Sequence, residues 1–326
     1  MTLAELIDAG AAFDAEYAGG LSNHRPMALL ALARLGASET RLNAFAQHYS
    51  QRLQPAPPPT SWPAGDAWAS RLGEREAWPA YRDLFGEWLL HEHSSDVLQQ
   101  ALPRLMQGCG AAAFHGLIRT AYALQSARRQ ELADALAYWA CRWLDLGASQ
   151  GAGTVADPET VLRQLRVVKS DAGLIVQRMA VAASTPHFQS TVNHLRVHQG
   201  TLPQLAALAA QAHAATGNFT ALHLVTSAHA MRLLMPYLDE PVPALQAYWR
   251  AFAAAVCVAG LRPAALPKAQ PWPALVAAAV ASDDDHLIKL VDSCREEQQA
   301  HGGAGAWQQA ATRAVQDAEA ALAGAA

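Results

Sequence analysis

Apolar residues recur at steps of three and four along almost the whole chain, which is the spacing that places them on one face of an α-helix. One such stripe runs from Leu29 to Leu35 and stops at Gly36, and another occupies residues 222–233 and stops at Pro236. Glycine and proline at these points are typical of helix ends. The pattern predicts an all-α fold, a bundle-like array of many helices.

Two stretches break the helical pattern. Gln54–Gly65, QPAPPPTSWPAG, contains too many prolines for a helix, because proline lacks the amide hydrogen and clashes with the preceding turn. The second stretch, Gly147–Pro158, is rich in glycine and divides the chain near its middle. The residues on its two sides have no distinct composition. We therefore predict one helical domain over 1–326, with a surface loop at 54–65 and a loop between two helical halves at 147–158.

The composition favours closely packed helices. Hydrophobic residues make up 52% of the chain and charged residues 16%, against about a quarter charged in ordinary soluble proteins. Much of the apolar share is alanine, which has the highest intrinsic helix propensity. The formal net charge is −4 and no basic stripe is present, so the electrostatic footprint of a nucleic-acid-binding protein is excluded.

The protein is expected to be cytoplasmic and to lie outside membranes. Its first residues, MTLAELIDAG, lack the basic and apolar regions of a signal peptide, and the apolar run Ala251–Leu261 is too short to span a bilayer. The four cysteines lie far apart without a C-x-x-C pair, as expected of reduced core residues rather than of disulfides or a zinc site. They are Cys109, Cys141, Cys257 and Cys294.

Common nucleotide-binding and hydrolase motifs are missing. Glycine patterns that begin at Gly108 and Gly151 fit the spacing G-x-G-x-x-A, but neither follows a predicted strand, so both are interpreted as helix boundaries. The remaining candidates for chemistry are histidines in otherwise apolar helices, where a buried imidazole needs a hydrogen-bond partner. Taken singly, such a histidine is more often structural than catalytic. These histidines are His24, His115, His223, His229 and His286.

Helical spacing relates these histidines to their neighbours. His115, Arg119 and Tyr122 follow one another by four and three residues, so one polar helix face is predicted to carry all three. The six residues from His223 to His229 turn a regular helix by about 600°, which leaves the two imidazoles about 120° apart. Only one of these two histidines is therefore expected to face a shared site.

A third cluster begins the predicted helix near residue 285. Asp283, His286 and Lys289 are each three residues apart, so they place an acid, a base and a cation on adjoining positions. The alternative is a capped helix start, with Asp283 and Asp284 near the positive end of the helix dipole.

Four segments resemble the questin oxidase-like family, and they occur in that family's order: NHRPMALLALARLG, FHGLIRTAYAL, LHLVTSAHAMRLL and DDDHLIKL. The similarity runs from about Ser22 to beyond Lys289. Fungal members are implicated in the oxidative ring opening of anthraquinones and related aromatic polyketides. The resemblance therefore implies a Baeyer–Villiger-type oxidation that uses oxygen and NADPH.

This resemblance predicts an oxidoreductase that holds a planar aromatic or quinone-like substrate between helices. In this hypothesis the histidines act as acid or base, and Arg119 or Lys289 stabilises a developing anion. Asn23, which is also expected to cap a helix, is predicted to bind the substrate together with Tyr122 and Thr226. The predicted catalytic residues are His24, His115, Arg119, His223, His229, His286 and Lys289.

Two other functions stay open. Neutral imidazoles suit zinc, iron or copper, so the histidines are also candidates for a metal-dependent enzyme, although the paired Glu-x-x-His motifs of di-iron bundles are absent. The third candidate is a non-catalytic helical protein that binds a small molecule, and it predicts that the histidines do not converge. A small aromatic molecule is the expected partner, and the oligomeric state is left open.

Overall fold

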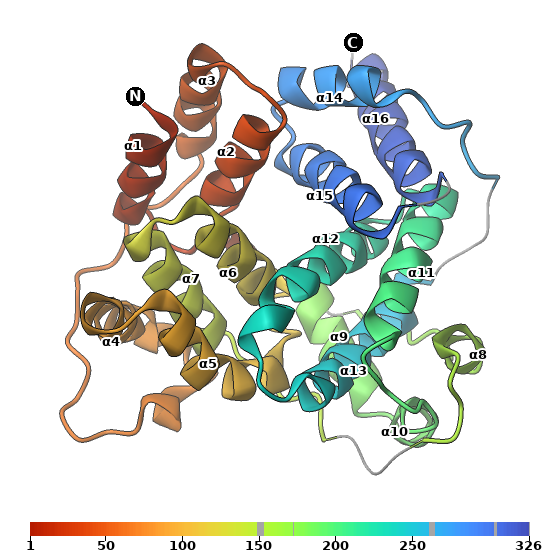
Figure 1. Ribbon diagram of the computed structural model, residues 1–326, viewed down its shortest axis with the longest axis horizontal. Helices are drawn as coiled ribbons and strands as arrows, with labels where there is room; N and C mark the ends of the chain where they lie inside the picture. The colour runs from red at the N-terminus through yellow and green to blue at the C-terminus, as the bar shows by residue number, and fades with distance from the viewer. Residues whose placement is uncertain (149–152, 172, 261–264, 303–304, 326) are drawn as a thin grey trace.

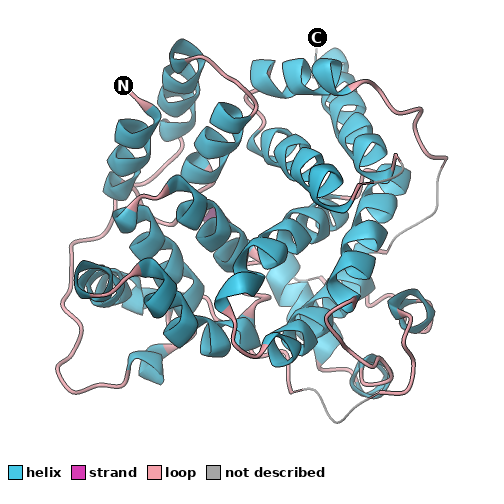
Figure 2. Cartoon of the chain, in the orientation of Figure 1, coloured by secondary structure: helices cyan, strands magenta, loops and turns pink. Residues whose placement is uncertain are grey.

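The computed structural model describes residues 1–326 except 149–152, 172, 261–264, 303–304 and 326 (Figure 1). Within these residues the regular structure is helical apart from one hairpin of two short strands, which confirms the all-α prediction (Figure 2). The α-helices are α1 (Leu3–Asp8), α2 (Arg25–Arg34), α3 (Glu39–Ser50), α4 (Trp78–His91), α5 (Ser94–Leu105), α6 (His115–Ser126), α7 (Arg129–Cys141), α8 (Pro158–Leu162), α9 (Ile175–Ala183), α10 (Pro186–Val192), α11 (Thr201–Thr216), α12 (Phe219–Leu234), α13 (Pro241–Ala259), α14 (Trp272–Ala281), α15 (Asp285–His301) and α16 (Ala306–Ala325). The strands are β1 (Glu16–Tyr17) and β2 (Leu21–Ser22), which pair antiparallel. Short 3-10 helices lie at η1 (Ala9–Ala12), η2 (Trp68–Arg71), η3 (Arg75–Ala77), η4 (Met106–Gly108) and η5 (Met235–Tyr237).

Polar caps and glycines set the helix ends that the sequence indicates. Asn218 caps the start of α12 and Asp284 caps the start of α15, because each side chain accepts two amide hydrogens of the first turn. The first predicted stripe lies on α2 and stops at Gly36, whose φ of 90° is open to glycine. The second predicted stripe lies on α12, which gives way to η5 at Met235.

The N-terminal and C-terminal parts of the chain lie side by side. In Figure 1, α1 to α7 occupy the left of the view, and α11, α14, α15 and α16 occupy the right. The two parts meet where α2 packs against α15 and α6 packs against α12. The four helices at this junction are also those that carry the family-like segments.

Alanine and glycine allow the helices to approach closely. Most of the buried positions in the centres of α7 and α13 are alanine or large aromatic residues. Gly116 of α6 faces Trp139 of α7, and a Cβ added at Gly116 would lie 2.7 Å from Cγ of Trp139. Only glycine fits at that crossing, which brings the start of α6 against α7. All four cysteines are buried and unpaired, as predicted.

Apart from Pro158, which begins α8, the two predicted loops contain no helix in their described residues. Residues 54–65 cross the surface without helical structure. In the second loop the described residues from 147 to 157 are non-helical, and α8 begins at Pro158. The glycine pattern at Gly108 ends η4, in agreement with a helix boundary, whereas the pattern at Gly151 begins within 149–152, outside the described residues.

One helix of the described chain, α13, is long and apolar enough to cross a membrane by length and composition. Most of it is buried inside the protein, as is usual for a core helix. It packs against α9 and α12.

Candidate functional site

Four histidines from four helices line one cavity. His24 precedes the first residue of α2, His115 begins α6, His223 lies in the second turn of α12, and His286 lies in the first turn of α15. The cavity has a volume of about 360 Å³, and the β1–β2 hairpin, the turn before α6 and the start of α9 form its other walls. Its lining consists of Tyr17, Gly20, Leu21, Ser22, His24, Ala112, Ala113, His115, Gly173, Leu174, Ile175, Val176, Arg178, Phe219, His223 and His286.

The imidazole rings contact one another directly. The ring of His24 stacks on that of His115 with centroids 4.6 Å apart and planes inclined by 16°, and it meets His286 edge-on at 4.6 Å. His223 lies 4.9 Å from His115 and 5.5 Å from His286. Phe219, which is half exposed, packs 4.7 Å from both His223 and His286. The cluster is therefore continuous, with an aromatic ring at its outer side.

Each of the four histidines has an acceptor beside its Nδ1 atom. The backbone oxygen of Ala112 lies beside Nδ1 of His115, and that of Phe219 lies 2.8 Å from Nδ1 of His223. A carbonyl oxygen can only accept, so both histidines carry their proton on Nδ1 and a lone pair on Nε2. Nε2 of His24 and of His115 is buried without a hydrogen-bond partner. These nitrogens are available to a ligand.

A buried carboxylate serves the other two histidines. Oδ1 of Asp285 accepts from Nδ1 of His24 and lies 3.0 Å from Nδ1 of His286. Nζ of Lys289, one turn further along α15, lies 3.9 Å from the same oxygen and is equally buried. Asp285 therefore holds two imidazoles in orientation while its charge is partly balanced by an ammonium group.

Burial keeps the imidazoles of His24, His115 and His223 neutral near pH 7. The pKa of His24 is lowered to about 3, chiefly by burial and then by the positive charge of Lys289, against the opposing effect of Asp285. Burial also lowers the pKa of His115 and His223 well below the usual value, with neighbouring imidazoles and Lys289 adding to the effect. Burial lowers the pKa of Lys289 to about 8. Burial alone would raise the pKa of Asp285, but the histidines beside it hold that pKa well below its usual value.

A strained turn positions His115. Ala112, Ala113 and Phe114 adopt φ angles of 46°, 54° and 71°, so three consecutive residues with side chains are left-handed. Each such residue costs about 1–2 kcal/mol relative to a right-handed conformation. The turn points the carbonyl of Ala112 at His115 and presents only small side chains to the cavity. Strain of this kind concentrates at functional sites.

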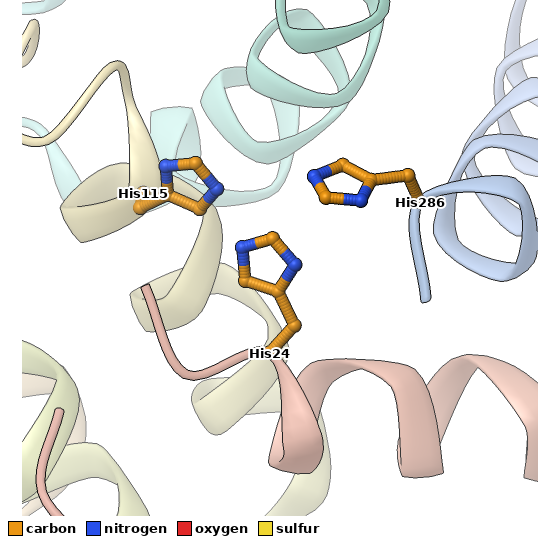
Figure 3. A group of neighbouring side chains, drawn as sticks. All are labelled: His24, His115 and His286. Carbon is orange, nitrogen blue, oxygen red and sulfur yellow. The ribbon is translucent and has the colours of Figure 1, made fainter. Parts of the chain in front are cut away.

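The imidazoles fit a metal ion. Ring nitrogens of His24, His115 and His286 lie within 4.8 Å of one another, and Figure 3 shows a nitrogen of His115 and one of His286 directed toward each other beside the ring of His24. Nitrogens that share one tetrahedral ion lie about 3.4 Å apart, so ring nitrogens at the 4.8 Å limit need to close by roughly 1.4 Å. Metal-bound histidines usually donate their other N–H to a carboxylate or backbone carbonyl, which is the arrangement around these rings.

A family model for Questin oxidase-like proteins matches residues 21–294, which includes all four histidines and most of the chain. The chain belongs to the Questin oxidase-like family. The resemblance seen in the four sequence segments is thereby confirmed, and the family name indicates an oxidase-like enzyme, hence an oxidoreductase. The chain has no match among curated proteins.

Some residues singled out within the family segments lie away from the cavity. Arg119 forms a buried two-pronged ion pair with Glu131 of α7, at 2.7 and 2.9 Å. Tyr122 donates a hydrogen bond to Asp292 at 3.0 Å. The predicted polar face of α6 is therefore divided, because only His115 reaches the cavity. This geometry indicates structural roles for Arg119 and Tyr122 rather than the site roles expected from the sequence.

The remaining predicted residues divide in the same way. His229 does not line the cavity, and its Nδ1 lies 2.8 Å from Glu297, in agreement with its rotation of about 120° from His223. Thr226 bonds backbone carbonyls of its own helix, and Asn23 accepts the amide of Arg25 at 3.0 Å. None of these three lines the cavity. Asn23 also differs from its expected place, because His24 occupies the cap position of α2.

Sequence reasoning missed Asp285 and Phe219. The three successive aspartates before His286 have separate roles: Asp283 pairs with Arg41, Asp284 caps α15, and Asp285 is buried against the histidines. Both interpretations of this segment were thus partly right, but the acid of the site is Asp285 rather than Asp283. Its place immediately before a candidate histidine was the available signal.

Proposed function

We propose that this protein is an oxygen-dependent oxidoreductase that oxidises a planar phenol or quinone at a transition metal ion held by His24, His115 and His286, with His223 beside them. One observation carries the proposal: four imidazoles from four helices converge on one cavity, each with an acceptor at Nδ1. The hypothesis of a non-catalytic binding protein predicts that the histidines do not converge, so their convergence on one cavity favours an enzyme.

A metal explains features that acid–base chemistry alone leaves unexplained. A general base that works near pH 7 needs a pKa close to that value, whereas burial lowers the pKa of His24 to about 3. Neutral imidazoles with free Nε2 lone pairs are the form that binds metals. Zinc undergoes no redox change, so an oxidase-like enzyme favours iron or copper. When bound, such an ion would supply the activation of oxygen.

The protein's own residues account for substrate binding. Tyr17 and Phe219 line the cavity as aromatic walls, and ring faces of this kind stack on flat substrates. The cavity volume of about 360 Å³ lies within the range of small-molecule sites. Lys289 does not line the cavity. Its ammonium group lies beside Asp285, where it partly balances the charge of the carboxylate rather than touching the substrate.

The use of NADPH and a Baeyer–Villiger-type insertion stay predictions from the family resemblance. Among the described residues the only sheet is the β1–β2 hairpin, so the strand-to-helix turn that usually binds a dinucleotide has no counterpart there. NADPH would therefore have to bind elsewhere, or the substrate itself would supply the electrons.

Metal analysis and oxygen uptake test the proposed function. The purified protein is analysed for iron, copper and zinc, and oxygen uptake is followed with a panel of hydroxylated anthraquinones, with and without NADPH. We expect about one iron or copper ion per chain and uptake that requires both the ion and an aromatic substrate. Folded protein that takes up no transition metal when iron or copper is supplied would overturn the metal site. A metal-loaded protein without uptake across the panel would overturn the substrate class.

A further inference from the structure

Arg178 is the only permanently charged residue among the described residues that line the histidine cavity. It belongs to the first turns of α9, and Ile175 and Val176 from the same helix start also line the cavity. No aspartate or glutamate is part of this lining. The cavity therefore contains one fixed positive charge and no side chain of opposite charge.

The guanidinium group of Arg178 has no partner within the described chain. Its Nε is buried without a hydrogen-bond acceptor, and its side chain forms no ion pair with any described residue. The more deeply buried arginines Arg25, Arg119 and Arg250 each donate to at least one oxygen of the chain. Because a buried donor without an acceptor costs stability, an unpaired guanidinium facing a cavity indicates an acceptor that comes from outside the chain.

The surroundings add to the preference for an anion. The helices α6, α9, α12 and α15 all start at the cavity, as shown by His115, Ile175, Phe219 and His286 in its lining. Helix starts carry partial positive charge, and the four imidazoles there compensate none of it. A metal ion at the histidines would increase the positive potential, against the carboxylates of Asp285, behind the rings, and Asp284, 3.8 Å from Nδ1 of His286.

We propose that Arg178 binds a carboxylate group of the aromatic substrate and so orients the ring toward the histidine cluster. Nε–H and one terminal N–H of a guanidinium form a two-pronged donor that matches the two oxygens of a carboxylate. Binding in this way satisfies the buried Nε. The proposal rests on the proposed function for the identity of the ring, and it narrows the substrate class from neutral quinones to aromatic acids.

Two probes of equal size test the role of Arg178: anthraquinone-2-carboxylate and anthraquinone-2-carboxamide, which differ in charge. Their dissociation constants are measured on the full chain by calorimetry for the native protein, Arg178→Met and Arg178→Lys. We expect the native protein to prefer the carboxylate. Arg178→Met should weaken carboxylate binding roughly 10- to 100-fold with little change for the carboxamide, and Arg178→Lys should retain part of the preference.

Arg163→Met is the matched control, because Arg163 is an exposed arginine of the same half of the chain, paired with Glu159 and absent from the cavity lining. It should bind both probes as the native protein does. Thermal melting verifies that Arg178→Met is folded. Equal binding of the two probes by the native protein, an unchanged preference in Arg178→Met, or an equal loss for both probes would each overturn the proposal, as would no binding of either probe at millimolar concentration.

Metal content and oxygen uptake with the carboxamide, measured on the same preparations, separate this inference from the proposed function. Protein that binds metal and oxidises the neutral probe, but shows no preference for the carboxylate, contradicts the role of Arg178 alone. Protein that prefers the carboxylate through Arg178 but takes up no metal contradicts the metal site alone, because the guanidinium contact needs no metal.

Discussion

Asp285, at the start of α15, accepts a hydrogen bond from Nδ1 of His24, which lies 261 residues earlier at the start of α2. Both side chains are buried. The contact joins the two parts of the chain at the cavity, and it fixes the proton of His24 on the nitrogen that faces away from the cavity.

Asp285→Asn is expected to weaken metal binding about 10- to 100-fold, because the carboxylate orients His24 and His286 and raises their basicity. Metal affinity is measured by competition with a chelator of known strength. Asp283→Asn is the control, since Asp283 is half exposed and pairs with Arg41 rather than with a histidine. An Asp285→Asn protein with native metal affinity would show that the imidazoles need no carboxylate.

His115→Gln is expected to abolish oxygen uptake with a loss of only about 1 kcal/mol of folding free energy, since it removes one hydrogen bond to Ala112. Activity and thermal melting are measured on the same protein. His91→Gln should change neither, because His91 is largely exposed and remote from the cavity. Retained uptake in His115→Gln would remove His115 from the catalytic set.

Arg119→Ala is expected to destabilise the protein by about 3–5 kcal/mol, because it leaves Glu131 buried without its partner. The catalytic role expected of Arg119 from the sequence predicts loss of turnover with an intact fold instead. Urea denaturation of Arg119→Ala, and of Arg119→Met combined with Glu131→Gln, distinguishes the two, since the double variant should recover much of the stability. A stable but inactive Arg119→Ala would restore the catalytic role.

The stability of the fold should fall as the pH drops from about 6.5 to 4, in part through His213 of α11. Burial lowers the pKa of His213 to about 4, so the unfolded chain takes up this proton first and the folded state loses stability progressively over that interval. The shift corresponds to about 3 kcal/mol. In His213→Asn, the free energy of unfolding obtained from urea denaturation should fall by about 3 kcal/mol less between pH 6.5 and 4 than in the native protein. An unchanged slope would show that His213 titrates normally.

Ala113→Gly is expected to raise the free energy of unfolding by about 0.5–1 kcal/mol, because glycine adopts the left-handed conformation without steric cost. Activity should fall, because the turn then holds His115 less rigidly. Ala127→Gly is the matched control: Ala127 has the same φ of 54° but ends α6 away from the cavity. It should gain stability and leave activity unchanged. Equal activity in both variants would show that the strain has no functional role.

The periodicity of apolar residues was sufficient to predict an all-α fold, since spacing by three and four residues recurs along almost the whole chain. The separation of His223 from His229 also followed from helical rotation alone. Pairings between helices were not predictable in this way. Glu131, twelve residues after Arg119, carries no mark of its partner, and nothing in the sequence shows that α9 brings Arg178 to the histidines.

The contact between His24 and Asp285 also has a consequence for synthesis on the ribosome. At about 5–20 residues per second, the 261 residues that separate them take roughly 13–50 s to translate. Throughout that interval α2 exists without α15, and α6 exists without α12 until residues 219–234 are made, so the apolar surfaces that later pack together are exposed to solvent and to chaperones. The nascent chain therefore has no cavity, and the site is assembled only as the last fifth of the protein is made.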